Sequence, residues 1–495
     1  MKEKERGAGI LLPVSSLPSP YGIGTIGKAA FEFADQLAAA GQKYWQVLPV
    51  GPTSYGDSPY QSFSAFAGNP YYIDLDFLAE EGLLKKNELE QDWGEREDHV
   101  DYELLFSKRF AVLKKAFLRS KHRNKSAYLE FEKAQEAWLD DYALYMAVKE
   151  KFGHKEWAVW DEGIRLRKPE SLKHYKRTLA GEIEFWKFCQ FKFYTQWKKL
   201  KTYVNGLGIR IIGDIPLYVA YDSADVWTHG DLFELDERKK PIHVAGVPPD
   251  YFSSTGQRWG NPLYDWEAME DSDFAWWRLR MKTLKSLYDV IRIDHFIGIV
   301  RYYSIPAGHP TAQNGTWRPG PGSKLTKVIK ESIGGETEII AEDLGVVSKG
   351  VRRLMKQTGW PGMKILLFGF DGTPDSEYLP HNYKSSNLVV YGGTHDNEPI
   401  AAYFKNMRGE RLKEAKAYLG VGSKRDFPDA MIKLGYSTIA DTVIFQMQDI
   451  LHLGAESRMN LPGKVGGWWR WRMDQNAFDT ERQRFLLDLT GRYNR

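Results

Sequence analysis

Short apolar runs recur along this 495-residue chain and predict strands that are buried on both faces, because they lack the polar alternation of half-exposed strands. Helical patterns separate most of the runs, and this rhythm is typical of a parallel sheet. Seven or eight such units favour a closed (β/α)8 TIM barrel over an open sheet. The strands are expected at 9–12, 44–50, 209–215, 290–296, 338–344, 363–368 and 388–391, with a weak eighth near 450–460.

One region breaks the rhythm. From about residue 77 to 205 there is almost no strand signal, and two long helical stretches, 126–152 and 181–203, take its place. The second stretch lines one broad face with aromatic and aliphatic side chains. We predict a mostly helical subdomain at 77–205, inserted between the start of the barrel at 1–76 and its remainder at 206–495. The segment 246–264, rich in glycine, proline and aromatic residues, is expected to be an active-site loop.

Composition narrows the class of protein. Apolar residues make up 42% and charged residues 27%, as in an ordinary water-soluble protein, and the net charge of +3 predicts no strong attraction to nucleic acid or anionic membranes. No uncharged apolar run reaches the length of about 18 residues that a membrane span needs. Cys189 is the one cysteine, so no internal disulfide and no cysteine cluster for zinc can form. These features predict a cytoplasmic protein.

The most informative residues are acids at the predicted carboxyl ends of strands, where α/β barrels build their active sites. A single acid there usually caps a helix or forms a structural ion pair. Acids at four strand ends favour an active site over four unrelated caps. The four acids are Asp214, Asp294, Glu342 and Asp396.

Alternation along a strand should place Arg292 on the same side as Asp294, and an arginine beside a buried aspartate keeps it ionised. The same parity does not choose between Glu342 and Asp343, which point to opposite sides. Two facing carboxylates are the equipment of glycoside chemistry, in which one is nucleophile or base and the other is general acid. A histidine precedes Asp396, but no ligand spacing supports a metal site.

A glycine-rich segment at 22–28, G-I-G-T-I-G-K, satisfies G-x-G-x-x-G and nearly matches a phosphate loop. We reject both interpretations. A phosphate loop needs Ser or Thr after the lysine, where this chain has Ala29. The dinucleotide motif needs its glycines directly after a strand, and three prolines separate them from the nearest one. We expect a loop that enters a helix at 29–40.

Aromatic residues divide into two groups. Tyr60 and Trp259 lie beside turn residues and are candidates for stacking on sugar faces. Trp468, Trp469 and Trp471 alternate with arginines, a pattern that could indicate nucleic acid, but the charge balance argues against it. We expect this run to pack structurally.

Eight segments in this order resemble the amylomaltase (disproportionating enzyme) family, a branch of the α-amylase-like barrel enzymes, with a looser match to about residue 463. They are GILLP at 9–13, SPYQ at 58–61, GDIP at 213–216, GVPPDY at 246–251, QRWGN at 257–261, RIDH at 292–295, AEDLG at 341–345 and GTHDN at 393–397. The resemblance implies a 4-α-glucanotransferase that passes part of an α-1,4-glucan to glucose or another glucan. It implies a retaining double displacement.

The resemblance also implies roles for residues. Asp294 matches the nucleophile, Glu342 the general acid/base and Asp396 a third carboxylate that stabilises the transition state. No metal or organic cofactor is implied. The sugar-binding positions are Tyr60, Asp214, Asp250, Trp259, Arg292 and His395, with Asn460 and Asp371 carried over from less distinctive loops.

Three rival functions remain open from the residues. The first is a plain α-glucan hydrolase with the same carboxylates, because acceptor choice depends on the shape of the site. The second is a glucan-binding protein without catalysis, which the intact carboxylates disfavour. The third is a nucleotide-dependent sugar enzyme, which the defective phosphate loop disfavours.

Overall fold

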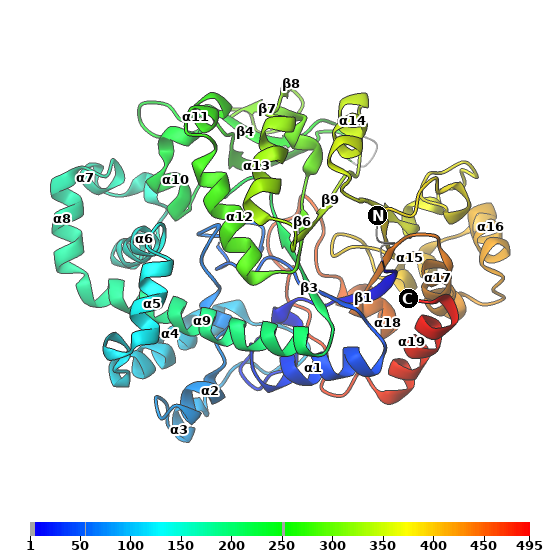
Figure 1. Cartoon of the computed structure of the whole chain (residues 1–495), viewed down its shortest axis with the longest axis horizontal. Helices are drawn as coiled ribbons and strands as arrows, with labels where there is room; N and C mark the ends of the chain where they lie inside the picture. The colour runs from blue at the N-terminus through cyan, green and yellow to red at the C-terminus, as the bar shows by residue number, and fades with distance from the viewer. Residues whose placement is uncertain (1–4, 55, 250–252) are drawn as a thin grey trace.

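The computed structural model describes residues 5–54, 56–249 and 253–495. At its centre, eight parallel strands follow one another in the order β10-β11-β12-β1-β2-β3-β6-β9 and curl into a nearly closed barrel (Figure 1). The predicted TIM barrel is therefore confirmed. The strands are β1 (Gly7–Leu11), β2 (Tyr44–Gln46), β3 (Arg210–Ile215), β6 (Val290–Ile293), β9 (Glu338–Ala341), β10 (Gly362–Ile365), β11 (Leu388–Tyr391) and β12 (Thr442–Gln446).

The eighth strand was predicted in the wrong place. It is β12, a run of five buried residues that pairs with β1 on one side and β11 on the other. Segment 450–460, where we expected it, begins with the last residue of a short helix and continues as a loop with one 3-10 turn. The apolar run was present in the sequence, but no glycine or proline separates β12 from the helix α18 (Met447–Ile450) that follows it.

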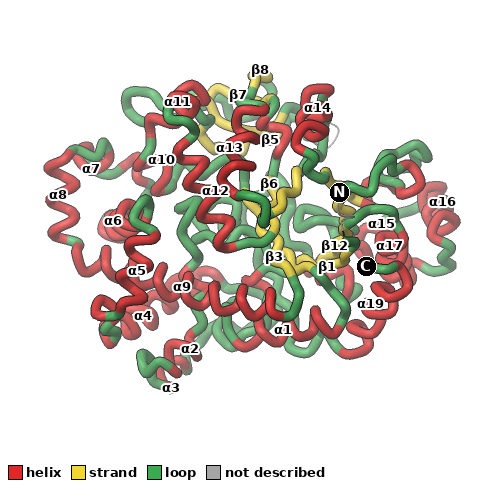
Figure 2. The backbone as a smooth tube through the Cα atoms, in the orientation of Figure 1, coloured by secondary structure: helices red, strands yellow, loops and turns green. Residues whose placement is uncertain are grey.

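Helices surround the barrel (Figure 2). α1 begins at Lys28, as the glycine-rich loop predicted, and α1 packs against both α9 and α19. The helices outside the insertion are α1 (Lys28–Ala39), α10 (Ala224–Thr228), α11 (Trp266–Asp271), α12 (Ala275–Leu287), α13 (Ser323–Ile333), α14 (Lys349–Thr358), α15 (Ile400–Asn406), α16 (Gly409–Leu419), α17 (Phe427–Ser437), α18 and α19 (Thr480–Tyr493).

An acidic side chain, Asp74, lies at the N-terminus of α1. Asp74 accepts a hydrogen bond from the Thr25 hydroxyl at 2.7 Å, and a Cβ added at Gly27 would lie 1.9 Å from its Oδ2. A carboxylate therefore fills the space at this helix terminus and would repel a bound phosphate.

The described residues between β2 and β3 form helices, loops and isolated bridges, which confirms the large helical insertion. The predicted helix at 126–152 is broken between α5 and α6, and Trp138, at this break, stacks its ring on Phe66. The limits of the subdomain, 77–205, remain a prediction. The helices of the insertion are α2 (Leu75–Glu80), α3 (Lys86–Leu89), α4 (Tyr102–Arg119), α5 (Ser126–Ala134), α6 (Leu139–Lys151), α7 (Glu162–Arg165), α8 (Pro169–Thr178) and the 27-residue α9 (Ala180–Gly206).

A second, antiparallel sheet is built from two barrel connections, in the order β5-β4-β7-β8. β4 (His243–Val247) and β5 (Gln257–Pro262) come from the segment after β3, while β7 (Arg301–Pro306) and β8 (Thr316–Pro319) follow β6. The segment 246–264 is therefore not a plain loop, since its two ends are paired strands. Gly246 makes the pairing possible, because an added Cβ would lie 2.1 Å from the Gln257 oxygen.

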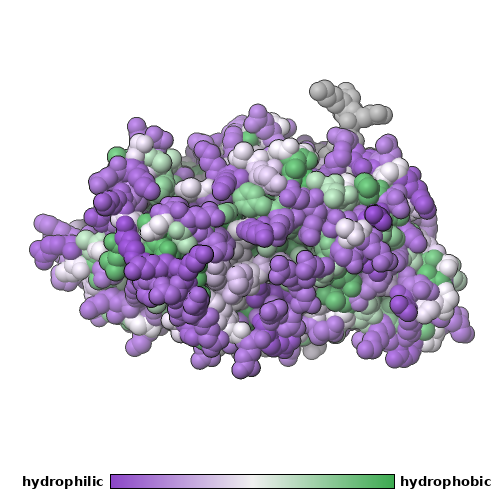
Figure 3. Space-filling model, turned by 90° about the horizontal axis from the view of Figure 1, so that it is seen from below, coloured by the Kyte–Doolittle hydropathy of each residue, from purple (hydrophilic) through white to green (hydrophobic). Residues whose placement is uncertain are grey.

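Hydrophilic side chains cover most of the face in Figure 3, with hydrophobic ones in small separate groups. In the parts of the chain that the structure describes, no helix is long and apolar enough to cross a membrane.

Candidate active site

Four acids gather at the carboxyl ends of the barrel strands. Asp214 lies within β3, Asp294 directly follows β6, and Glu342 directly follows β9. Asp396 lies in the loop after β11. The order of the strands places β3, β6 and β9 side by side, so three of the acids come from neighbouring strands.

Arg292 holds two of these carboxylates together. Its Nη1 lies 2.7 Å from both oxygens of Asp214 and 3.1 Å from Oδ1 of Asp294. The sheet register explains the first contact, since Asp214 pairs with Arg292 across β3 and β6. Alternation along the strand explains the second, as the sequence predicted. Arg292 is nearly fully buried, so its charge depends on these acids for compensation.

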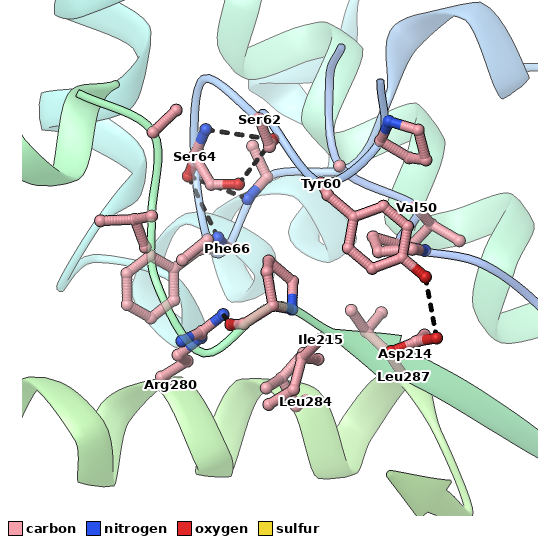
Figure 4. A pocket seen from close by; sticks show the side chains of 18 of the residues that line it. Val50, Tyr60, Ser62, Ser64, Phe66, Asp214, Ile215, Arg280, Leu284 and Leu287 are labelled. Atoms are coloured by element: carbon pink, nitrogen blue, oxygen red, sulfur yellow. Dashed lines mark hydrogen bonds between the residues drawn. The ribbon is translucent and has the colours of Figure 1, made fainter. Parts of the chain in front are cut away.

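Tyr60 reaches the same acid from the loop after β2. Its hydroxyl donates to Asp214 Oδ2 at 2.9 Å (Figure 4). Both side chains border a small cavity of about 50 Å³. Arg280 reaches this cavity from α12 and donates to the carbonyls of Pro216 at 2.7 Å and Leu217 at 3.3 Å, just beyond the end of β3. The hydrogen bonds from Arg280 thus stabilise the main chain just after the strand that carries Asp214.

Main-chain groups hold the carboxylate of Glu342. The His295 N–H donates to its Oε2 and the Leu344 N–H to its Oε1, both at 2.7 Å. His295 has left-handed backbone geometry (φ 55°), an uncommon conformation for a residue with a side chain. Strain of this kind is typical of functional sites. Here it accompanies a main-chain bond that holds Glu342 beside the residue after Asp294.

The two buried acids differ in proton affinity. Burial, reinforced by the negative charge of Asp294, raises the pKa of Glu342 to about 8 against the opposing charge of Arg292. Burial raises the pKa of Asp294 to about 6, and Arg292 limits this rise. The Asp294 side chain still exposes 31% of its surface, although it lies deep in the protein. At pH 7 the site therefore combines an ionised Asp294 with a protonated Glu342.

Asp396 belongs to a separate group of contacts. The Asn460 amide donates to its Oδ1 at 2.6 Å, and His395 Nε2 lies 3.5 Å from the same oxygen. The His395 ring stacks on Tyr60 with centroids 5.0 Å apart, which connects this group to Asp214. Asp396 keeps 44% of its side chain exposed and is therefore accessible to a ligand.

Trp469 supports this group. Its ring lies 5.8 Å from the centroids of both Tyr60 and His395, and its side chain is buried. Structural packing was the expected role of this tryptophan, but nothing in the sequence indicated that it would pack against two candidate site residues.

Within this site, two buried ring nitrogens lack a hydrogen-bond partner among the described residues, His295 Nε2 and His395 Nδ1. Burial lowers the pKa of His295 to about 4, so this ring is neutral at pH 7. Trp259 meets His295 edge to face with centroids 4.8 Å apart. An aromatic edge beside unpaired ring nitrogens suits a ligand that carries both hydroxyls and apolar faces.

One candidate residue, Asp371, is not brought into this site. Asp371 is exposed, and its Oδ1 accepts the Thr373 N–H at 2.9 Å. No contact joins it to the carboxylates among the described residues. Asp250 lies outside the residues that the structure describes. In the described part of the chain, no group of three or more His, Cys, Asp or Glu side chains could hold a metal ion.

The matching family model and the curated relatives carry the same description. A family model described as 4-alpha-glucanotransferase matches residues 12–477. A 4-alpha-glucanotransferase of Clostridium butyricum is 47% identical over 485 residues, covering 97% of this chain and 99% of the relative. One of Thermus thermophilus is 45% identical over 503 residues, covering 99% and 100%.

Solved structures extend this likeness to the fold. An amylomaltase from Streptococcus agalactiae in complex with acarbose matches with a TM-score of 0.96 and 44% identity, covering 99% of this chain and 100% of that one. An α-amylase from Geobacillus thermoleovorans, at 11% identity and a TM-score of 0.51, covers all of this chain and 79% of its own, and shares the fold alone.

Proposed function

We propose how this chain works on the premise that it belongs to the 4-alpha-glucanotransferase family and is a 4-alpha-glucanotransferase. Such an enzyme cuts an α-1,4-glucan and joins the cut segment to another sugar. The observation that carries our assignment of roles is the different setting of two acids: Asp294 is partly exposed and contacts Arg292, whereas Glu342 is buried and bound by main-chain N–H groups. Burial accordingly raises the pKa of Glu342, to about 8, further than that of Asp294, to about 6.

The first half of the reaction breaks the donor glucan. Asp294 attacks the anomeric carbon, while Glu342 gives its proton to the glycosidic oxygen. The reducing-end fragment leaves with that proton, and a covalent glycosyl-enzyme ester forms on Asp294. An ionised nucleophile beside a protonated acid is the starting state that this step needs, and it matches the proton affinities of the two side chains at pH 7.

The second half transfers the segment. Glu342, now ionised, takes the proton of an acceptor 4-hydroxyl, and the resulting oxygen attacks the anomeric carbon and displaces Asp294. Two inversions retain the α configuration. The bonds from the His295 and Leu344 N–H groups hold the Glu342 carboxylate when it carries a charge.

The remaining groups bind and orient the reacting sugar. Arg292 offsets the negative charge on Asp294 before the ester forms and after it is broken, and it contacts Asp214 as well. Asp396, held by Asn460, is accessible and would bind ring hydroxyls more strongly as positive charge develops at the anomeric carbon. Tyr60 and Trp259 would contact sugar faces.

We propose that the donors are maltooligosaccharides or fragments of starch or glycogen and that glucose is an acceptor. The support is a relative: the amylomaltase at 44% identity is described in complex with acarbose. We also propose that the enzyme acts in the cytoplasm, because its one cysteine gives it no internal disulfide to maintain in an oxidising compartment. Asp371 and Asp250 stay candidate sugar-binding residues.

Chemical rescue tests the two roles. Asp294→Asn and Glu342→Gln should each lower turnover of maltotriose by roughly 10³-fold or more. With α-maltosyl fluoride as donor and azide as acceptor, Glu342→Gln should regain rapid turnover and form α-maltosyl azide, because fluoride leaves without an acid and azide attacks without a base. Asp294→Asn should form no α-maltosyl azide. Equal rescue of both variants would refute the assignment.

The products formed from maltotriose distinguish a transferase from a plain hydrolase. Incubation with maltotriose should give glucose and a ladder of longer maltodextrins at a constant number of reducing ends. A rising number of reducing ends without longer products would identify a hydrolase.

A further inference from the structure

A carboxylate beside the acid/base closes the seam of the barrel. β9 and β10 stand at the two ends of the strand order, so the barrel closes between them. Two hydrogen bonds cross this seam: the Ala341 N–H donates to the Pro361 carbonyl at 2.9 Å, and the Met363 N–H donates to Asp343 Oδ1 at 2.8 Å. The Asp343 side chain thus provides the acceptor that a neighbouring main chain provides elsewhere in the sheet.

Glu342 lies between these two anchored residues. The bonds at Ala341 and Asp343 fix the main chain on both sides of it, because they involve its immediate neighbours. Asp343 points to β10, while the Glu342 carboxylate points to the His295 N–H in the site. The Glu342 N–H also donates to the Ile293 carbonyl, and its carbonyl accepts the Phe296 N–H, both at 3.1 Å. A change in the seam would therefore reach the acid/base through its neighbour Asp343, while these bonds on the β6 side remain.

Met363 is a firm anchor for this contact. Its side chain is 1% exposed, and the residue pairs with Val389 in the β10–β11 ladder. Its Sδ accepts a hydrogen bond from Arg292 Nε at 3.3 Å. Asp343 is thus tied to a residue that contacts the arginine holding Asp294.

The residues around Asp343 leave space for its carboxylate to reach the Met363 N–H. A Cβ added at Gly362 would lie 2.6 and 2.7 Å from the two Asp343 oxygens, so the carboxylate can reach Met363 because residue 362 is a glycine. Lys364, on β10, and Glu377, which follows that strand, pair with each other and are the charged groups facing Asp343 from this side.

We propose that Asp343 is a positioning residue for transfer: its bond to Met363 across the seam holds Glu342 in place to exchange protons with the glycosidic and acceptor oxygens. The proposal rests on the acid/base role given to Glu342 above. It requires that loss of the bond impairs the steps in which Glu342 moves a proton and spares those in which it does not.

The test compares Asp343→Ala with Asp343→Asn, whose amide oxygen can still accept the Met363 N–H. Asp289→Ala is the matched control, since the Asp289 carboxylate accepts the Ile211 N–H at 2.8 Å, next to the start of β3 and far from the carboxyl ends. Each protein is assayed with maltotriose, and with α-maltosyl fluoride plus azide. Thermal unfolding of each variant measures its stability.

We expect Asp343→Ala to lower kcat on maltotriose by roughly 10- to 100-fold with KM within about twofold, because small misplacements cost this much. Its reaction of α-maltosyl fluoride with azide should stay within about threefold of the parent. Asp343→Asn should keep kcat within about threefold, and Asp289→Ala should lose stability without losing kcat.

Three outcomes would overturn the proposal. The first is an unchanged kcat in Asp343→Ala. The second is an equal loss of kcat in Asp343→Ala with maltotriose and with α-maltosyl fluoride plus azide, and the third is an equal loss of kcat in Asp289→Ala. If Asp343→Ala does not fold, a loss above tenfold in Asp343→Asn overturns it and retention supports it. The function itself is judged separately by Glu342→Gln. If that variant keeps its maltotriose activity, the acid/base assignment fails, whatever Asp343 does.

Discussion

At the scale of single residues, Arg292 shapes the chemistry because one guanidinium contacts two carboxylates. Its Nη1 lies 2.7 Å from Asp214 and 3.1 Å from Asp294. Burial alone would favour a neutral Asp294. The arginine limits this effect, while the acid across the site, Glu342, keeps its proton to a higher pH.

This difference predicts the pH dependence. Below about pH 6 Asp294 gains a proton and loses nucleophilicity, and above about pH 8 Glu342 loses the proton that it must donate. We expect a bell-shaped pH profile of kcat/KM for maltotriose, with an acidic limb near pH 6 and an alkaline limb near pH 8. Because the two acids interact, both apparent pKa values describe the pair and not one residue each. Initial rates across the range check this profile. With α-maltosyl fluoride as donor and azide as acceptor, the alkaline limb should disappear, and its persistence would contradict the assignment to Glu342.

The Tyr60 hydroxyl offers a second test at this scale. Tyr60→Phe removes the donor to Asp214 and keeps the ring that stacks on His395. A hydrogen bond to a charged group contributes about 1.5–3 kcal/mol, so we expect a loss of roughly 10- to 100-fold in kcat/KM. Tyr436→Phe, which loses a buried bond to Gln42, is the control and should affect stability alone. Equal activity losses in both variants would argue against a role for the Tyr60–Asp214 bond.

Sequence reasoning reached residues that lie on strands and missed those that depend on loops. Alternation along β6 was enough to place Arg292 beside Asp294. It could not choose between Glu342 and Asp343, because that choice depends on what lies on each side of β9. The position of Trp469 against Tyr60 follows from the path of a long loop, which no local pattern encodes.

At the scale of helices and strands, the sequence again predicted what a local pattern encodes and missed what depends on other parts of the chain. Seven barrel strands were predictable because burial on both faces leaves a continuous apolar run in the sequence. β12 has such a run, but it leads straight into α18 without a turn residue, so its position was missed. The break between α5 and α6, where Trp138 packs against the distant Phe66, was also missed.

Gly68, in the loop after β2, makes one of the close contacts between α9 and the barrel. The Gln190 side chain exchanges two hydrogen bonds with the main chain of Gly68, at 2.7 and 2.9 Å. A Cβ at Gly68 would lie 2.0 Å from the Phe193 ring. We expect Gly68→Ala to destabilise the protein by about 1–3 kcal/mol, because the packed ring must move.

Gly181→Ala, at the second residue of α9, is the control. An added Cβ there meets nothing within 4 Å, so the change should stabilise the protein by about 0.5–1 kcal/mol through helix propensity. Urea unfolding of both variants measures the two effects. Equal stability of Gly68→Ala and the parent would show that α9 tolerates displacement.

At the scale of the whole molecule, two sheets meet around one site. The barrel supplies the carboxylates, and the antiparallel sheet supplies Trp259 on β5. Transfer must compete with water, which is abundant. We infer that the β4–β5 hairpin covers the site and offers aromatic contacts to an acceptor sugar.

Shortening this hairpin tests the inference. Replacing the tip at 249–255 with a two-residue turn should raise hydrolysis of maltotriose relative to transfer, because water then competes better for the glycosyl-enzyme. The ratio of new reducing ends to longer maltodextrins measures the partition. The loop at 312–315 is unsuitable as a control, because the Ala312 N–H donates to the Thr255 carbonyl in the tip, so the unshortened parent assayed in parallel is the reference. An unchanged partition in the shortened hairpin would remove this hairpin from the explanation of transfer.

The pairing of β1 with β12 has a consequence for synthesis on the ribosome. β1 ends at Leu11, but its partner β12 begins only at Thr442 and is therefore synthesised much later. At about 5–20 residues per second, one edge of β1 waits roughly 20–90 s for its neighbour. During that interval the nascent chain presents an unpaired hydrophobic edge, the kind of surface on which aggregation starts. Translation speed and chaperone supply, as well as thermodynamic stability, therefore influence how much active enzyme a cell obtains.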